Sequence, residues 1–112
     1  MRHSLVLLAS SLATIVVAAG CGGSGTSEPV ATTEVAMAKS YRFDPKQIEI
    51  EAGDRVTWTN EDKFTHTVQV DGQEDHQVER GESVSIAFPQ AGTYHYVCTL
   101  HSRDMEGEVI VG

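Results

Sequence analysis

Beyond its first thirty or so residues, the chain is a series of short segments in which apolar and polar side chains alternate. Ile48 and Ile50 alternate with amide and carboxylate residues, and Val56 and Trp58 alternate with arginine and threonine. A period of two places the apolar side chains on one face of a β-strand, and these segments lack the 3.6-residue period of an amphipathic helix. Short strands separated by turns rich in glycine and proline predict an all-β fold, an antiparallel Greek-key β-sandwich.

Two details of this pattern define the expected strands more closely. The alternation predicts that Val35, Met37, Tyr41 and Phe43 share the inner side of the sandwich. The polar and acidic stretch Gln73–Gly81 interrupts the alternation. We therefore expect this stretch to form a loop.

The N-terminus has the composition of a secretory signal and not of a folded strand or helix. Met1–His3 is basic, Leu5–Ala19 is apolar, and small residues precede Cys21. The apolar run is short for a membrane span. A cysteine directly after such a cleavage site resembles the processing motif of bacterial lipoproteins. We predict that residues 1–20 are removed and that Cys21 carries a lipid; the alternative is an ordinary signal cleaved near Gly20.

The segment after the signal predicts a tether that holds a single domain outside the cytoplasm. Residues 21–33 are mostly Gly, Ser, Thr and Pro, which is typical of a flexible linker, and residues 34–112 form the expected domain. We expect an extracytoplasmic protein, lipid-anchored to the membrane on its periplasmic or cell-surface side. Loss of Arg2 with the signal changes the formal net charge from −8 to about −9, which disfavours nucleic acid as a partner.

Cys98 belongs to a group of candidate metal ligands. His101 follows it by three residues, Met105 follows His101 by four, and His66 lies about thirty residues upstream of Cys98. A thiolate, two imidazoles and a thioether are the donors of a type 1 copper site, in which methionine is a weak axial ligand. Zinc would also suit these donors. Taken alone, Cys98 would be interpreted as a buried free thiol and Met105 as a core residue.

The two other histidines of the mature chain are not expected to bind the metal. His76 lies in the acidic stretch, and His95 should point away from the sheet face that carries Tyr94 and Tyr96. The remaining cysteine, Cys21, belongs to the cleavage motif. No disulfide is therefore expected.

The chain resembles small cupredoxins of the plastocyanin, amicyanin and halocyanin type from about Tyr41 to Val111. This resemblance implies a cupredoxin-like sandwich, one type 1 copper ion, and the ligands His66, Cys98, His101 and Met105. It also implies that a backbone N–H near Thr67 donates to the Cys98 sulfur. The motifs that carry it are Tyr41-x-Phe43-x-Pro45, Ile48-x-Ile50-x-Ala52-Gly53-Asp54-x-Val56-x-Trp58-x-Asn60, His66-Thr67-Val68, Thr93-Tyr94-His95-Tyr96-Val97-Cys98-Thr99-Leu100-His101 and Met105-Glu106-Gly107-Glu108-Val109.

The function implied by the resemblance is the transfer of single electrons between redox partner proteins, one a donor and one an acceptor, by a monomer. His101 would be the partly exposed ligand through which electrons pass, and Leu100 would lie beside it in an apolar docking patch. Because the chain has no His-x-His pair, we do not expect an enzyme. The alternative function is copper storage, sensing or delivery without electron transfer.

Polar residues near the expected site carry two further predictions. Asn60 should cap the turn before His66. The acidic pairs Glu61–Asp62 and Glu74–Asp75 should be solvated, and the alternative is an acidic docking face for a basic redox partner.

Overall fold

The computed structural model of the chain describes residues 28–101 and 104–112. The predicted signal peptide, Cys21 and the tether up to residue 27 lie outside the described residues. No helix in the described part is long and apolar enough to cross a membrane. The strands are β1 (Val30–Ala31), β2 (Glu34–Ala38), β3 (Arg42–Asp44), β4 (Gln47–Ile50), β5 (Arg55–Asn60), β6 (His66–Val70), β7 (Asp75–Val78), β8 (Ser83–Ala87), β9 (Gly92–Val97) and β10 (Glu106–Val111).

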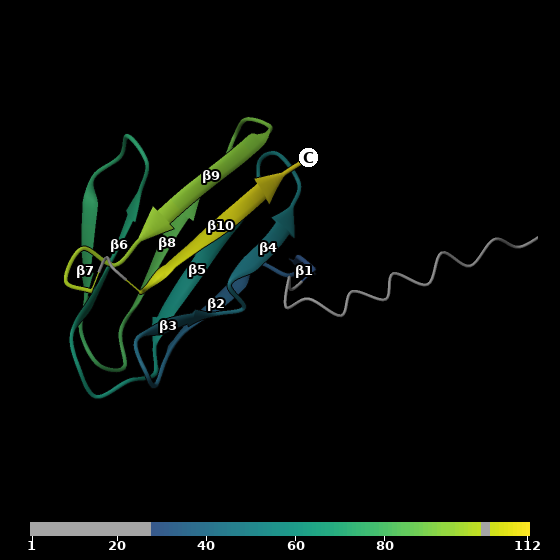
Figure 1. Cartoon of the computed structure of the whole chain (residues 1–112). Helices are drawn as coiled ribbons and strands as arrows, with labels where there is room; N and C mark the ends of the chain where they lie inside the picture. Colours follow the sequence, from purple (N-terminus) through teal and green to yellow (C-terminus); the bar gives the residue numbers. More distant parts are fainter. Residues whose placement is uncertain (1–27, 102–103) are drawn as a thin grey trace, which may run out of the picture.

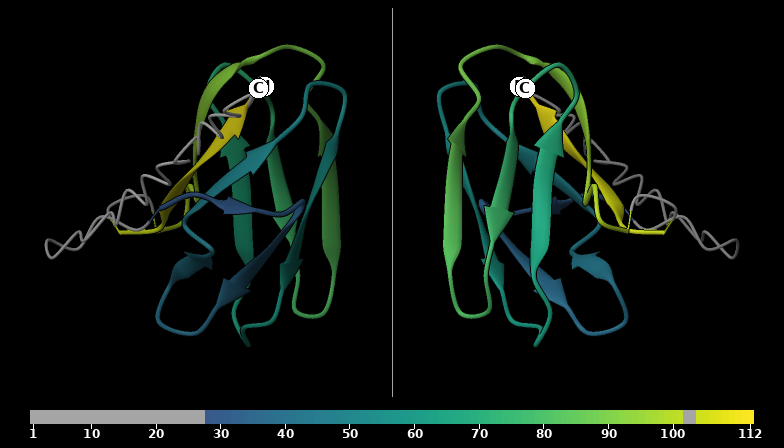
Figure 2. Two further views of the ribbon diagram at one scale, coloured as in Figure 1. Left: turned by 90° about the vertical axis from the view of Figure 1, so that its right-hand side faces the viewer. Right: turned by 90° about the vertical axis from the view of Figure 1, so that its left-hand side faces the viewer.

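The strands form two sheets, seen from three sides in Figures 1 and 2. The larger sheet has the order β1-β4-β10-β9-β6-β7, and the smaller has the order β3-β2-β5-β8. Alternate side chains of both sheets point inward and form one core. The predicted β-sandwich is therefore confirmed.

Both sheets are mixed, whereas the alternating sequence pattern predicted antiparallel pairing throughout. Strands β1 and β10 run parallel to β4, and β2 runs parallel to β5. The chain crosses between the sheets from β3 to β4 and back again to β5, so neighbours in a sheet are often not successive in sequence. β1 also pairs with β4 although Val30 and Ala31 lie in the segment expected to be a linker.

The centre of the core is aromatic. Trp58 and Tyr96 are fully buried, and the Tyr96 ring meets the Trp58 ring edge-on, with 5.1 Å between the centroids. Phe43 packs on Tyr96 in the same way at 4.7 Å. Burial of each large apolar side chain contributes roughly 1.5–3 kcal/mol to folding. These rings join the two sheets, because Trp58 and Phe43 lie in one and Tyr96 lies in the other.

Gly107 is required by the close approach of this aromatic centre. It lies opposite Tyr96 in the β9–β10 pair. A Cβ atom at this position would collide with the Tyr96 hydroxyl and would lie 2.7 Å from the backbone oxygen of Lys46. The absence of a side chain at Gly107 therefore allows β10 to pass over Tyr96. Burial raises the pKa of this tyrosine.

The stretch Gln73–Gly81 is not entirely a loop, contrary to the prediction. It contains β7, which pairs with β6 at the edge of the larger sheet. Only Val78 of this strand is fully buried. Because the other side chains of this edge strand are polar, its sequence shows no alternation of apolar and polar residues.

His95 faces outward, as predicted, with its side chain 41% exposed. Its Nε2 lies 3.2 Å from Glu106 and its Nδ1 lies 3.6 Å from Asp71. Partial burial tends to lower the pKa of His95, but the Glu106 and Asp71 carboxylates outweigh that effect and raise it above 6.5. The His95 side chain thus links β9 to β10 and to the β6–β7 turn.

We expect the stabilising effect of His95 to depend on pH. A raised folded-state pKa means that the contribution is complete below the unfolded-state pKa and is lost as the pH rises through the folded-state value. Because the ion pairs are exposed, His95→Gln should lower the free energy of unfolding by no more than about 1 kcal/mol at about pH 5. At about pH 9 the difference should vanish. Urea unfolding of wild type and variant at both pH values measures this difference in the free energy of unfolding. An equal difference at both pH values would contradict a stabilising role for the protonated His95 side chain.

Candidate metal centre

The segments that carry the predicted ligands His66, Cys98 and His101 lie at the end of the sandwich opposite the C-terminus, where β9 connects to β10 (Figure 1). His66 begins β6, and Cys98 follows the last residue of β9. These strands are neighbours in the larger sheet. As a result, His66 and Cys98 are both fully buried, and Nδ1 of His66 lies 3.8 Å from Sγ of Cys98.

The Cys98 sulfur accepts hydrogen bonds from the other strand of this pair. The Thr67 backbone N–H donates to Sγ at 3.3 Å, which confirms the predicted donor. The Thr67 hydroxyl lies 3.7 Å from the same sulfur, and it accepts a hydrogen bond from the Thr99 N–H at 2.7 Å. Donors that point at a sulfur stabilise its negative charge, so this environment suits a thiolate ligand.

Backbone hydrogen bonds join Cys98, His101 and Met105 to one another. The Cys98 N–H donates to the Met105 oxygen at 2.9 Å, and the Met105 N–H donates to the His101 oxygen at 3.0 Å. The His101 N–H in turn donates to the Cys98 oxygen at 3.1 Å. Met105 is fully buried. Cys98 and Met105 thus lie in the core, and His101 is half-buried at its rim.

His101 packs against an aromatic side chain at this rim. Its ring centroid lies 4.3 Å from that of Tyr41 and 5.4 Å from that of His66. Within residues 28–101 and 104–112, no three His, Cys, Asp or Glu side chains already converge to hold a metal. The structure therefore brings His66 and Cys98 into contact, and it holds His101 beside them against Tyr41.

Tyr41 does not lie on the inner side with Phe43, contrary to the prediction. It is 38% exposed, and both Tyr41 and Ser40 have positive φ values, 55° and 71°. This left-handed backbone turns the Tyr41 ring outward, where it stacks on Phe64 at 5.8 Å. Phe64 and Leu100 are also exposed, so three of the four exposed large apolar side chains of the described residues come from segments at this end.

Asp62 is the site residue that the sequence analysis missed. It was expected to be solvated as part of an acidic pair, but it is only 6% exposed. Its Oδ2 lies 2.9 Å from Nε2 of His66, and this hydrogen bond lowers the pKa of Asp62. The four-residue spacing to His66 was the available signal, but paired acidic residues are usually on the surface.

Asn60 organises the loop that carries Asp62, which confirms its predicted capping role. Its side-chain amide donates to the backbone oxygens of Phe64 at 2.7 Å and Val78 at 2.9 Å. Its side-chain oxygen accepts the N–H of Asp62 at 2.9 Å. A single buried amide therefore ties this loop to β7 and turns Asp62 inward.

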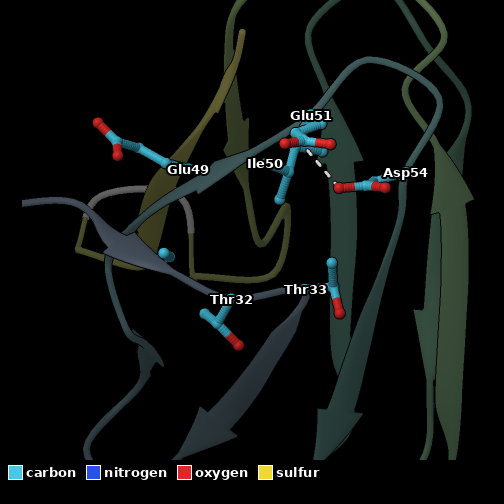
Figure 3. Close-up of a pocket in the computed structure, with 7 residues that line it drawn as sticks. Thr32, Thr33, Glu49, Ile50, Glu51 and Asp54 are labelled. Atoms are coloured by element: carbon cyan, nitrogen blue, oxygen red, sulfur yellow. Dashed lines mark hydrogen bonds between the residues drawn. The ribbon is translucent and has the colours of Figure 1, made fainter.

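A separate hollow lies near the other end of the sandwich, where Val111 of β10 pairs with Ile50 (Figure 3). The Glu51 N–H donates to the Asp54 carboxylate at 3.0 Å in its wall. Its lining contains no histidine, cysteine or methionine, so it is not a candidate for the predicted metal. The lining residues are Ala31, Thr32, Thr33, Glu49, Ile50, Glu51 and Asp54.

Comparison with known proteins identifies relatives over nearly the whole chain. The family described as Cupredoxin-like domain matches residues 11–111. Amicyanin-alpha of Methylorubrum extorquens is 34% identical over 111 residues, which cover 93% of this chain and 92% of that protein. The chloroplastic plastocyanin of Tetradesmus obliquus is 31% identical over 128 aligned positions, which cover 97% of this chain and 88% of the relative.

A solved structure also shares this architecture. A methionine-to-alanine variant of amicyanin, determined in its Cu(I) form, superposes with a TM-score of 0.62 at 29% identity. The match covers 74% of this chain and 86% of the amicyanin chain.

Proposed function

This chain belongs to the cupredoxin-like family, and from that we propose that it is a mononuclear type 1 copper protein that carries single electrons between partner proteins outside the cytoplasm. The observation that most supports the proposal is the buried contact between Nδ1 of His66 and Sγ of Cys98, with the Thr67 N–H directed at the sulfur. A buried thiolate that accepts a backbone hydrogen bond is well suited to act as a soft ligand for a metal ion.

The four proposed ligands have different roles. Cys98, His66 and His101 would hold the copper, and the fully buried Met105 would be a weaker donor to it. Bound copper supplies the change between Cu(II) and Cu(I), with one electron accepted from a donor protein and passed to an acceptor. The protein contributes a rigid site, because Cys98 and Met105 are tied through their backbones. Such a role involves no substrate turnover, so we do not assign an enzymatic activity.

The visible and EPR spectra of the copper-loaded protein test this proposal. We expect an intense thiolate-to-Cu(II) absorption that disappears on reduction and returns on oxidation. Uptake of copper without this absorption would contradict the proposed ligands. Rapid loss of copper to a competing chelator, together with slow electron exchange, would favour storage or delivery.

The exposed apolar surface around His101 is the proposed docking site for redox partners. Leu100 is 56% exposed and adjoins His101 in the chain, and His101 packs on Tyr41. A partner that docks here would have the shortest path to the metal, through the His101 ring.

A charge at Leu100 should slow electron exchange with the native partner without changing the metal site. We expect Leu100→Lys to reduce the second-order rate constant about tenfold, because a lysine at the centre of an apolar contact must be desolvated. The visible spectrum should be unchanged. Val30→Lys is a matched control, since Val30 is also exposed (45%) but lies on edge strand β1. Equal rates for wild type and Leu100→Lys would place the docking site elsewhere.

The proposed location outside the cytoplasm depends on the N-terminal segment. We propose that residues 1–20 are a signal peptide, that Cys21 carries the lipid and that the following residues form the tether. If so, the native protein should be found in the membrane fraction, and Cys21→Ser should release it or leave it unprocessed. Stable anchoring needs more than one acyl chain. A native protein found only in the soluble fraction would contradict the anchor.

A further inference from the structure

His66 contacts a different partner with each of its ring nitrogens. Nδ1 faces the Cys98 sulfur at 3.8 Å, and Nε2 faces Oδ2 of Asp62 at 2.9 Å. The ring is fully buried, and Asp62 is only 6% exposed. The orientation of this imidazole is therefore decided by the two protein groups on either side of it.

Asp62 is itself held in a fixed position. Its N–H donates to the side-chain oxygen of Asn60 at 2.9 Å, and its Oδ1 accepts the Lys63 N–H at 2.8 Å. One carboxylate oxygen is thus bonded to the backbone of its own loop, and the other is directed at His66. Asn60 is anchored in turn to Val78 of β7, so the carboxylate belongs to the rigid part of the fold.

This arrangement selects one tautomer of the neutral imidazole. A metal at the Cys98 side must use the lone pair of Nδ1, so the proton of a neutral ring must be on Nε2. A carboxylate can only accept a hydrogen bond, and Asp62 therefore favours the Nε2–H form. A hydrogen bond from a ligating histidine to a carboxylate also makes the ring a stronger donor to the metal.

We propose that Asp62 is a positioning residue that keeps Nδ1 of His66 free for copper and that its charge favours Cu(II) over Cu(I). This inference rests on the copper site proposed above. Cu(II) with a thiolate has one more positive charge than Cu(I) with a thiolate. A buried negative charge next to a ligand stabilises the more positive state more strongly. Asp62 should therefore lower the reduction potential of the site.

The charge is tested with Asp62→Asn, which keeps the size of the side chain and removes its charge. Loss of such a partner commonly reduces metal affinity by about 10- to 100-fold. We expect Cu(II) binding to weaken about tenfold relative to Cu(I), equivalent to a rise of about 59 mV in the reduction potential. Glu61→Gln is the matched control, because it removes the same charge from the adjacent exposed residue. The reduction potential of Glu61→Gln should change by less than a third of the shift expected for Asp62→Asn. Equal shifts in the two variants, or none in Asp62→Asn, would overturn the proposal.

The proton position is tested separately by nitrogen-15 NMR of the wild-type full-length chain without metal, at about pH 8. We expect the His66 proton on Nε2, with slow exchange against solvent. In Asp62→Ala, which removes the acceptor, exchange should be faster and the Nδ1–H form should be populated. A wild-type ring with its proton on Nδ1 would overturn the role of Asp62, whether or not any variant folds. A wild type that shows the Nε2–H form but develops no thiolate colour with copper would instead contradict the proposed function.

Discussion

Replacing Cys98 with serine should abolish the thiolate-to-copper absorption completely. Cys98 is the proposed ligand from which the charge-transfer band would arise, and its buried sulfur lies 3.8 Å from Nδ1 of His66 and accepts the Thr67 N–H. A serine oxygen is a hard and weakly acidic donor that gives no such band and binds Cu(I) poorly. We expect copper affinity to fall by at least about 100-fold. Absorption spectra and a chelator titration measure the two effects.

The same variant should remain folded. A serine hydroxyl can accept the Thr67 N–H that now reaches the sulfur, so the buried oxygen keeps a hydrogen-bond partner. The free energy of unfolding of the metal-free variant should lie within about 2 kcal/mol of the wild-type value. Thr99→Ser, which keeps the neighbouring hydroxyl and backbone N–H, is the control and should retain the colour. A coloured Cys98→Ser protein would rule out Cys98 as the ligand.

Gly107→Ala should strongly destabilise the fold. The added methyl group would overlap the Tyr96 hydroxyl and lie 2.7 Å from the Lys46 backbone oxygen. The Tyr96 ring cannot move away easily, because it is fully buried against Trp58 and Phe43. Overpacking of a core costs about 1–3 kcal/mol, and we expect the upper end of that range or more. The midpoint of urea unfolding measures the loss.

Two comparisons separate this collision from a general glycine effect. Gly112→Ala should be almost neutral, since its Cβ would approach only the Ile50 oxygen, at 4.0 Å. Tyr96→Phe removes the nearest atom but leaves the ring carbon, 2.5 Å from the added methyl group, so the double variant Gly107→Ala/Tyr96→Phe should recover only a small part of the loss. The two substitutions should therefore be non-additive. Additive effects would show that the Tyr96 hydroxyl does not cause the destabilisation.

The proposed metal site combines the most and the least predictable parts of the fold. The donor residues were evident because thiol, imidazole and thioether groups are rare and their spacing is distinctive. The Thr67 N–H to Cys98 bond was also predicted, from the resemblance to cupredoxins, and the structure confirms it. The donor residues are recognised from the short segments around them, whereas the Thr67–Cys98 bond joins neighbouring strands and was expected only because similar sequences share a fold.

The position of Asp62 was not predictable from the residues around it. Next to Glu61 it has the appearance of a surface charge. It turns inward because Asn60 bonds to the Val78 oxygen, which comes from a strand eighteen residues further along the chain. Tyr41 is similar, because its left-handed backbone breaks the alternation that would place it inside. In both cases the deciding contacts are distant in sequence or depend on a backbone conformation that composition does not specify.

The β-sandwich, the inward faces of most strands and the candidate ligands were therefore predictable from the amino-acid pattern alone. These follow from a period of two and from side-chain chemistry, which are local properties. The parallel pairings of β4 and β2, the edge strand β7 and the buried Asp62–His66 contact became visible only in the folded chain. Strand pairing and the burial of a charge depend on which segments become neighbours, and a pattern of alternating side chains contains no information about that choice.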